Sequence, residues 1–319
     1  MKNLLNKINK IITSLNIEFD YIDYIAGDAS NRKYFKIFNK NLCKILMYDD
    51  NGKESINNFL HKTYLFDSYG LRVPKIFSAY SESGIIVMES FGDSKFSKII
   101  NHKNELLLYK SALDSLIFIH KKNKSDKLTN YTKEVFFDES KIFFEWYLRL
   151  NSFKKKKYKL FDFKNTLFNY LGSIENLPLV NVHRDFHIDN LFYLDSELSH
   201  KKCGWIDYQD ALVGPIVYDV MSLLEDARRD LKKGNKEKLI FYYIEKANIL
   251  DKNSFLHAFK IVAIQRHLKV LGIFARLAIR DKKPDYIKHI PRVLKMLKDN
   301  LSDSKCKEME TIIKPLIKE

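Results

Sequence analysis

The first 90 residues differ in pattern from the rest of the chain, and this contrast is the strongest constraint on the fold. Five short runs rich in β-branched and aromatic residues predict strands at residues 21–26, 33–38, 42–48, 75–80 and 85–89. Turn-forming residues separate the first three runs, as consecutive antiparallel strands require. Residues 4–15 and 53–69 have apolar residues at helical spacing, so each of these segments predicts a helix.

Helical patterns dominate beyond Gly92. They predict helices over residues 104–120, 138–151, 158–172, 216–231, 253–280 and 286–300. A strand-and-loop region over residues 180–214 interrupts them. We therefore predict an α+β fold with two lobes: a small antiparallel sheet over residues 1–90 and a mostly helical lobe over residues 91–319.

Composition narrows the classes to which the chain can belong. Its 319 residues are 45% hydrophobic, which is enough to bury a large core. A formal charge of +15 would suit a nucleic-acid or membrane partner. However, the lysines are scattered, and the one dense run, residues 154–157, reads as a solvated face. No nucleic-acid-binding motif accompanies that run, so we expect no nucleic-acid partner.

The cysteines and the apolar segments bear on the compartment. Cys43, Cys203 and Cys306 are far apart and form no CxxC pair, which favours a reducing environment over a disulfide framework. The first 16 residues carry lysines within their apolar pattern and lack the features of a signal peptide. No apolar run reaches the length of a membrane span. We expect a cytoplasmic protein without a membrane partner.

The segment His183–Asn190, HRDFHIDN, carries the strongest chemical signal. Asp185 and Asn190 stand in the spacing D-x4-N, and Asp207 follows Asn190 by 17 positions. Phosphoryl transfer requires a carboxylate near the attacking hydroxyl and metal ions on the phosphates. The spacing predicts that Asp185 is a catalytic base and that Asn190 and Asp207 supply the oxygen ligands that Mg²⁺ prefers.

This segment allows two other interpretations. His183 and His187 are four residues apart, as zinc ligands on a helix can be, but no HExxH pattern is present. His183 can also be a scaffold residue that bonds main-chain groups. Asp185 has no such explanation, because a buried carboxylate requires a partner or a function.

The segment 27–35, GDASNRKYF, is a second signal. A turn of small residues between two strands can fold over phosphate groups and offer them main-chain N–H groups. Hairpin turns use the same residues, so this signal depends on its position ahead of the catalytic segment. It makes Ser30, Asn31, Arg32 and Lys33 candidate nucleotide-binding residues.

With these motifs in view, the chain resembles the aminoglycoside phosphotransferase-like family of small-molecule kinases, which have a protein-kinase-like two-lobed fold. Within that family it is similar to the anomeric sugar kinases of peptidoglycan recycling, which act on N-acetylmuramate and N-acetylglucosamine. Beyond the two motifs above, three segments carry the closer resemblance: IDYQDALVGPIVYD at 206–219, QRHLKVLGIFARL at 265–277 and IPRVL at 290–294.

The resemblance implies ATP as phosphoryl donor, Mg²⁺, and a small-molecule acceptor, an amino sugar. It also implies that Asp219 braces the catalytic loop. The adenine-binding hinge would use main-chain groups of Met88, Glu89 and Ser90.

One position departs from the kinase pattern. Met47 occupies the place on the third strand at which kinases carry a phosphate-binding lysine, and Lys44 is an odd number of residues away, so it points to the other face of a strand. We therefore expect Arg32 or Lys33 to meet the phosphate charge, and the sequence leaves both open.

Candidate acceptor-binding residues are His187, Gln209, Asp210 and Arg266. Amide and carboxylate groups suit sugar hydroxyls, and a guanidinium could meet a lactyl carboxylate. The alternatives make Gln209 a turn residue and Arg266 a surface or inter-helix ion-pair partner. Three other functions stay open at this point: a kinase for choline, homoserine or an aminoglycoside, a nucleotide-binding pseudokinase, and a basic nucleic-acid-binding protein.

Overall fold

A computed structural model describes residues 2–25, 32–40, 42–122, 124–151 and 160–317. The chain forms two compact units. Unit 1 comprises residues 1–99 and 191–209, and unit 2 comprises residues 100–190 and 210–319. The predicted α+β fold is confirmed, with an antiparallel sheet in unit 1 and mostly helices in unit 2. The domain boundary at residues 90 and 91 stays a prediction.

The sheet of unit 1 has five antiparallel strands in the order β1-β2-β3-β5-β4. Their bounds agree with the predicted runs to within two residues: β1 Tyr21–Ile25, β2 Arg32–Asn39, β3 Leu42–Asp49, β4 Ile76–Tyr80 and β5 Ile85–Glu89. The central strand β3 pairs with β2 and β5 and carries Leu46 and Met47, both fully buried.

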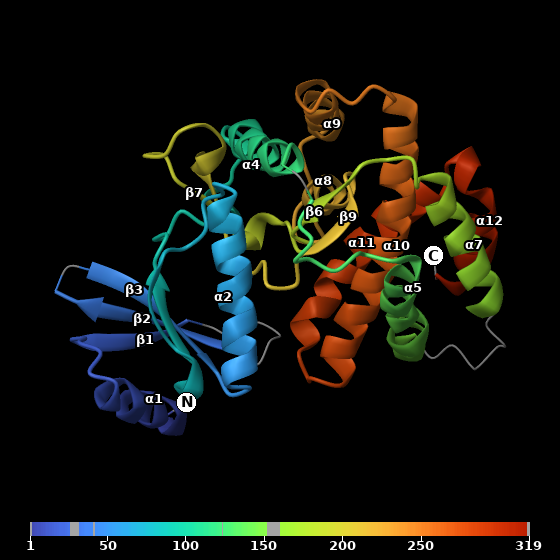
Figure 1. Cartoon of the computed structure of the whole chain (residues 1–319). Helices are drawn as coiled ribbons and strands as arrows, with labels where there is room; N and C mark the ends of the chain where they lie inside the picture. The colour runs from blue at the N-terminus through green and yellow to red at the C-terminus, as the bar shows by residue number, and fades with distance from the viewer. Residues whose placement is uncertain (1, 26–31, 41, 123, 152–159, 318–319) are drawn as a thin grey trace. The chain divides into compact units, whose positions relative to one another are not determined.

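Each face of this sheet is covered by one helix (Figure 1). Since side chains alternate along a strand, Leu46 and Tyr48 pack with α1 (Lys2–Ser14), whereas Met47 packs with α2 (Lys53–Ser68). The amphipathic pattern of each helix predicts this arrangement, because an apolar stripe has to be buried against another element.

A later part of the chain completes unit 1. The hairpin of β7 (Leu191–Tyr193) and β8 (Cys203–Trp205) follows the catalytic segment, and α3 (Phe96–Ile99) contributes a single turn. Tyr208 is fully buried against the aromatic rings of Phe59 and Phe66 on α2. Residues more than 140 positions apart therefore share one core.

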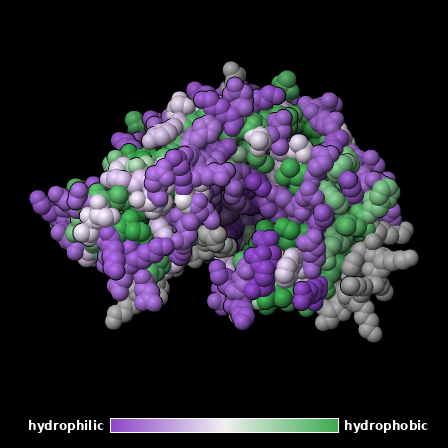
Figure 2. All heavy atoms as spheres, turned by 60° about the horizontal axis from the view of Figure 1, so that its bottom comes forward, coloured by the Kyte–Doolittle hydropathy of each residue, from purple (hydrophilic) through white to green (hydrophobic). Residues whose placement is uncertain are grey.

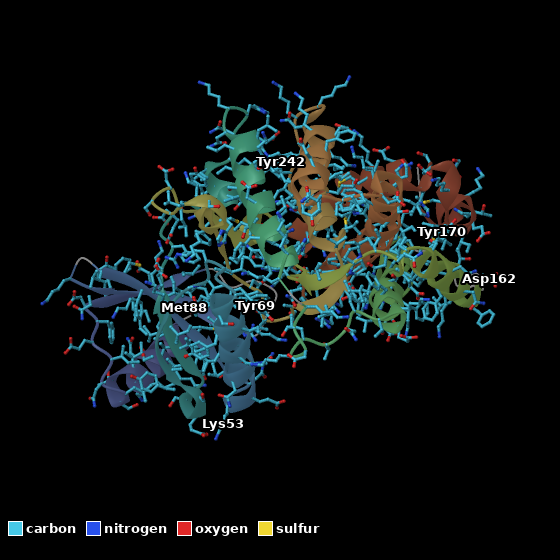
Figure 3. All side chains as sticks on the ribbon, turned by 45° about the horizontal axis from the view of Figure 1, so that its top comes forward. Lys53, Tyr69, Met88, Asp162, Tyr170 and Tyr242 are labelled. Atoms are coloured by element: carbon cyan, nitrogen blue, oxygen red, sulfur yellow. The ribbon has the colours of Figure 1, made fainter. Side chains whose placement is uncertain are left out.

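Unit 2 is built around the long helix α10 (Lys252–Ile279), and a two-stranded ribbon, β6 (Leu179–Val182) with β9 (Leu212–Pro215), leads into and out of the catalytic region. The other helices are α4 Glu105–His120, α5 Lys133–Ile142, α6 Leu148–Leu150, α7 Leu160–Ser173, α8 Tyr218–Leu224, α9 Asn235–Lys246, α11 Ile290–Leu301 and α12 Lys307–Ile313. Side-chain hydrogen bonds join neighbouring helices. The hydroxyl of Tyr242 on α9, labelled in Figure 3, donates a hydrogen bond to Asp114 Oδ1 on α4 at 2.6 Å.

Three predicted helices were wrong in extent. The helix expected over 138–151 begins at Lys133, and residues 143–147 form a π-helical turn within it. The helix expected over 216–231 ends at Leu224, where Glu225 and Asp226 turn their buried side chains to other segments. The helix expected over 286–300 begins as a 3₁₀ turn and becomes α-helical only at Ile290.

The surface is rich in polar groups. On the face shown in Figure 2 hydrophilic side chains predominate, and hydrophobic ones are scattered among them. Scattered apolar residues are normal on a protein surface. Among the described residues no helix combines the length and apolar character needed to cross a bilayer.

Candidate functional site

The catalytic segment of unit 2 runs from the end of β6 into a short 3₁₀ turn, Ile188–Asn190. Asp219, in the first turn of α8, accepts hydrogen bonds from the main-chain N–H groups of His183 at 2.6 Å and of Arg184 at 3.0 Å. The ring Nδ1 of His183 accepts from the N–H of Asp185 at 3.2 Å. Asp219 thus braces the loop in the way the resemblance implied, and His183 bonds main-chain groups within it.

Asp185 lies beside two cations of α10. The closest Asp185–Arg266 approach joins Oδ1 and Nη2 at 3.7 Å. Burial alone would raise the pKa of the Asp185 carboxyl, but the charges of Lys269 and Arg266 hold it well below its ordinary value. Asp185 is therefore ionised at neutral pH and its side chain is 40% exposed. An exposed, ionised carboxylate can accept a proton from a hydroxyl group.

Asn190 and His187 lie on the same loop. The Nδ2 of Asn190 donates to the main-chain carbonyl of Asp185 at 2.9 Å, so Oδ1 is the amide atom suited to a metal. His187 is buried, and burial lowers its pKa well below the ordinary value, which keeps the ring neutral at pH 7. Its Nδ1 has no hydrogen-bond partner among the described residues.

Asp207 belongs to unit 1 and adopts a left-handed backbone with φ of 64°. Gln209 donates from Nε2 to Asp207 Oδ1 at 2.9 Å, and the buried Oε1 of Gln209 has no partner in the described part of the chain. Burial raises the pKa of Tyr34 on β2, and the negative charge of Asp207 raises it further. Asp207 therefore faces the α2 side of the sheet, to which Tyr34 belongs.

The two candidate phosphate-binding cations lie on opposite faces of β2. Arg32 extends over the α2 face, where its Nε is 3.3 Å from Asp49 Oδ2 and its Nη2 is 3.2 Å from Ser55 Oγ. Lys33 extends over the α1 face and pairs with Asp50 at 3.0 Å. Only the first face carries Met47 and Tyr34.

Ser30 and Asn31 lie outside the described residues.

The predicted hinge residues lie at the end of β5. Met88 is buried within the sheet (Figure 3). Glu89 forms a two-point ion pair with Arg72, with distances of 2.5 and 2.8 Å, and its N–H donates to the carbonyl of Lys75 at 2.8 Å. Ser90 follows the last paired residue of the strand, and its Oγ accepts from Gly92 N–H at 3.2 Å. Ser90 is thus the predicted hinge residue whose main chain is outside the sheet.

The predicted acceptor residues differ in their surroundings. Asp210 is exposed, and its main-chain carbonyl accepts from Arg184 Nη1 at 3.0 Å. Arg266 is only 6% exposed, so the interpretation as a surface cation is wrong. Its guanidinium contacts Asp185, the main-chain carbonyl of Arg184 and the hydroxyl of Tyr218, because α10 passes directly beside the catalytic loop.

Several residues of this region were missed in the sequence. Glu139 on α5 contacts the guanidinium of Arg184 and lies 2.8 Å from Lys269 Nζ. Tyr131 and Tyr218 share a hydrogen bond of 3.0 Å beside them. Lys269 follows Arg266 by three positions and so shares its helix face, which is a signal that could have found it. Nothing in the sequence around Glu139 distinguishes it from other helical carboxylates.

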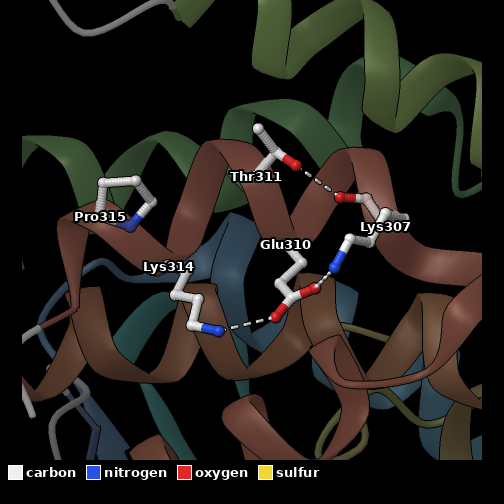
Figure 4. Close-up of a pocket in the computed structure, with 5 residues that line it drawn as sticks. All are labelled: Lys307, Glu310, Thr311, Lys314 and Pro315. Atoms are coloured by element: carbon white, nitrogen blue, oxygen red, sulfur yellow. Dashed lines mark hydrogen bonds and ion pairs between the residues drawn. The ribbon is translucent and has the colours of Figure 1, made fainter.

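A shallow surface pocket on α12 is separate from these residues (Figure 4). It has a volume of about 290 Å³, and Lys307, Glu310, Thr311, Lys314 and Pro315 line it. Its charged groups are paired with one another along the helix, with Glu310 3.0 Å from each lysine. Such local pairs are typical of a solvated helix face.

Residues 22–244, more than half of the chain, match the model of the Phosphotransferase enzyme family. The chain belongs to this family. It is therefore a phosphotransferase that acts on an alcohol group of a small molecule, as the catalytic segment predicted.

The chain is also similar to a named relative and to two solved structures. A protein of Neisseria meningitidis serogroup B, named N-acetylmuramate/N-acetylglucosamine kinase, is 32% identical over 297 residues, which cover 88% of this chain and 85% of the relative. The choline kinase LicA of Streptococcus pneumoniae aligns with a TM-score of 0.63 at 14% identity, covering 93% of this chain and 99% of that one.

The aminoglycoside phosphotransferase APH(2'')-Ib, described as ADP-bound, aligns with a TM-score of 0.56 at 16% identity and covers 92% and 98% of the two chains. At these identities the structures show that the fold is shared. The predicted protein-kinase-like fold and the predicted family are both confirmed.

Proposed function

We propose that this phosphotransferase moves the γ-phosphoryl group of ATP to the anomeric hydroxyl of N-acetylmuramate or N-acetylglucosamine, forming a sugar 1-phosphate. The observation that carries the proposal is the match over 88% of the chain to a relative named for these two sugars. The ionised Asp185 and its braced loop support the chemistry.

In the proposed reaction Asp185 accepts the proton of the anomeric hydroxyl. The anomeric oxygen bonds to the γ-phosphorus, and the bond between the γ-phosphorus and the oxygen that links it to the β-phosphate breaks. An anomeric hydroxyl is more acidic than an ordinary alcohol, which eases the transfer of its proton to a single carboxylate. Most of the rate enhancement in such reactions comes from positioning and charge neutralisation. The hydrogen bonds that fix the Asp185 loop are therefore part of the catalytic apparatus.

Asn190, through Oδ1, and Asp207, through its carboxylate, would hold Mg²⁺. Both are hard oxygen donors, and the fixed orientation of the Asn190 amide fits this assignment. Mg²⁺ held there would neutralise part of the negative charge of the phosphate groups.

For the donor nucleotide, we assign the phosphate-facing cation to Arg32, because it shares a face with Met47 and Tyr34. The adenine would be met by main-chain groups at Ser90, since the N–H of Glu89 is already bonded to Lys75. Use of ATP and three free cysteines fit a cytoplasmic enzyme.

For the acceptor, His187 and Gln209 each offer a buried polar atom without a partner among the described residues, His187 Nδ1 and Gln209 Oε1. A sugar hydroxyl can satisfy such an atom, and recognition of this kind rejects analogues that lack the hydroxyl. The exposed carboxylate of Asp210 is a further candidate.

The test is phosphorus NMR of the product formed from ATP and each amino sugar. A sugar 1-phosphate is the expected product, and the methyl glycoside of N-acetylglucosamine, which lacks a free anomeric hydroxyl, should not react. The Asp185→Asn variant is the matched protein control. A 6-phosphate, or turnover only with amino alcohols or aminoglycosides, would overturn the sugar assignment and leave the phosphotransferase intact.

A further inference from the structure

Arg184 holds an unusual backbone conformation next to the proposed base. Its φ is 75°, in the left-handed region that residues other than glycine rarely adopt. Such a conformation persists only when its surroundings enforce it. Because Arg184 immediately precedes Asp185, its dihedral angles set the direction in which the Asp185 side chain leaves the loop.

Four contacts enforce this conformation. The N–H of Arg184 donates to Asp219 Oδ1 at 3.0 Å, and its carbonyl accepts from Arg266 Nη1 at 2.8 Å. Its guanidinium donates to the main-chain carbonyl of Asp210 at 3.0 Å and to Glu139. Three of these partners lie within or just before α5, α8 and β9, and the fourth, Arg266, comes from the middle of α10.

Arg266 joins the backbone contact to the base itself. Its Nη1 bonds both the carbonyl of Arg184 and the hydroxyl of Tyr218, at 2.8 and 3.1 Å, while its Nη2 lies 3.7 Å from Asp185 Oδ1. The guanidinium is also 5.5 Å from the centre of the Tyr218 ring. A planar guanidinium with this many fixed contacts is held in one orientation.

Every cation of this cluster has a carboxylate beside it. Its cations are Arg184, Arg266 and Lys269, and each contacts a carboxylate of the cluster, namely Glu139 or Asp185. Arg266 and Lys269 are 6% and 8% exposed. A buried cation whose partners are already in place would have to give up those contacts to bind an acceptor carboxylate, which is costly.

We propose that Arg266 is a positioning residue that aims Asp185 at the acceptor hydroxyl by clamping the left-handed Arg184, and that it does not recognise the acceptor. This inference rests on the proposed role of Asp185 as base. It separates two functions that a cation in this motif could have: binding the lactyl carboxylate of N-acetylmuramate, or orienting the base for every acceptor.

The two acceptors distinguish these roles, because N-acetylglucosamine lacks the lactyl carboxylate. In Arg266→Ala we expect kcat to fall about 100-fold with both sugars, as misplacement of a reacting group by ~1 Å can cause. The KM values for the two sugars, and the ratio of their kcat/KM values, should change less than about threefold. Added guanidinium should restore part of kcat. Arg280→Ala, at the exposed end of the same helix, is the control.

A rise in KM for N-acetylmuramate alone would overturn the proposal and assign Arg266 to acceptor recognition. Unchanged kcat would overturn it as well. If Arg266→Ala does not fold, Tyr218→Phe removes one hydrogen-bond partner of the guanidinium and should lower kcat in the same way, to a smaller extent. An unaffected kcat in a folded Tyr218→Phe protein would count against the clamp.

The activity of the wild-type protein toward the two sugars tests the proposed function separately. If it phosphorylates neither sugar, the sugar assignment is wrong, and the kcat loss and guanidinium rescue are measured with the alcohol that it does phosphorylate. A kcat loss without rescue there overturns the clamp.

Discussion

Arg32 and Lys33 are neighbours in the chain, yet they belong to different sides of the sheet. Arg32 shares the α2 face with Met47, whereas Lys33 is paired with Asp50 on the α1 face. Arg32→Ala should raise the KM for ATP about tenfold or more, since a lost hydrogen bond to a charged group is worth about 1.5–3 kcal/mol. Lys33→Ala, the matched control, should leave it within about twofold.

Steady-state kinetics at saturating acceptor measure both variants. A larger effect in Lys33→Ala would reverse the assignment, and no effect in either would mean that metal and main-chain groups alone hold the phosphates.

Replacement of Asp185 and replacement of Asp207 should impair different steps, turnover and nucleotide binding. Asp185→Asn keeps the size of the side chain but removes the base, so kcat should fall about 10²–10⁴-fold while nucleotide affinity is retained. Asp207→Ala should weaken the binding of Mg-ATP itself. Calorimetric titration with a non-hydrolysable ATP analogue and Mg²⁺ separates the two outcomes. Near-normal turnover of Asp185→Asn would remove it from the proposed role.

The sequence points to the proposed catalytic residues more directly than to the residues that surround them. Asp185, Asn190 and Asp207 stand at a spacing that only phosphoryl transfer explains well, so each could be named in advance. Glu139 could not, because its role depends on α5 lying beside α10, a tertiary contact that no local pattern encodes. Arg266 could be named as a candidate, but its burial could not be predicted, because it depends on α10 packing beside the catalytic loop.

At the scale of elements, one carboxylate joins four helices. Glu225, just after α8, contacts Lys236 of α9, His267 of α10 at 2.5 Å and Asn300 of α11 at 2.8 Å. Burial raises its pKa, but the hydrogen bond from His267 and the charge of Lys236 outweigh burial and lower the pKa to about 2. A carboxylate with a lowered pKa stabilises the fold at pH values above the ordinary pKa of the group.

The free energy of unfolding should therefore lose about 3 kcal/mol as the pH falls from about 4.5 toward 2, since each pKa unit corresponds to about 1.4 kcal/mol. Glu225→Gln should be less stable at pH 7, and its free energy of unfolding should change less with pH over that range. Urea unfolding at several pH values measures both. The exposed Glu237→Gln on α9 is the control and should follow the wild type. If the free energy of unfolding of Glu225→Gln changed with pH as steeply as that of the wild type, this role of Glu225 would be wrong.

The elements themselves were largely predictable where one pattern dominates. All five strands of the sheet follow runs of β-branched and aromatic residues. The π-helical turn at residues 143–147 was not predictable. Gly272 of α10 packs there against the backbone so closely that a Cβ would come within 2.4 Å of the carbonyl carbon of Ile142. Helix α9 was not predicted because its apolar residues form one continuous run of six, residues 239–244, which has no helical spacing.

For the whole molecule, the change of pattern near residue 90 predicted two parts, but not how the chain is divided between them. Residues 191–209 belong to unit 1 although 91 residues separate them from its first segment. Their own sequence falls in the predicted strand-and-loop region and does not indicate the element against which it packs. The assignment depends on Trp205 and Tyr208, which are fully buried against Phe66.

This division has a consequence for synthesis on the ribosome. Phe59 and Phe66 of α2 are covered in unit 1 by Tyr208, which the ribosome adds more than 100 residues after it has completed the sheet. At roughly 5–20 residues per second, the nascent sheet would wait about 5–20 s with this aromatic face uncovered. The N-terminal part of the enzyme is therefore a natural client for chaperones that act during translation, and its folding is complete only after the catalytic loop has been made.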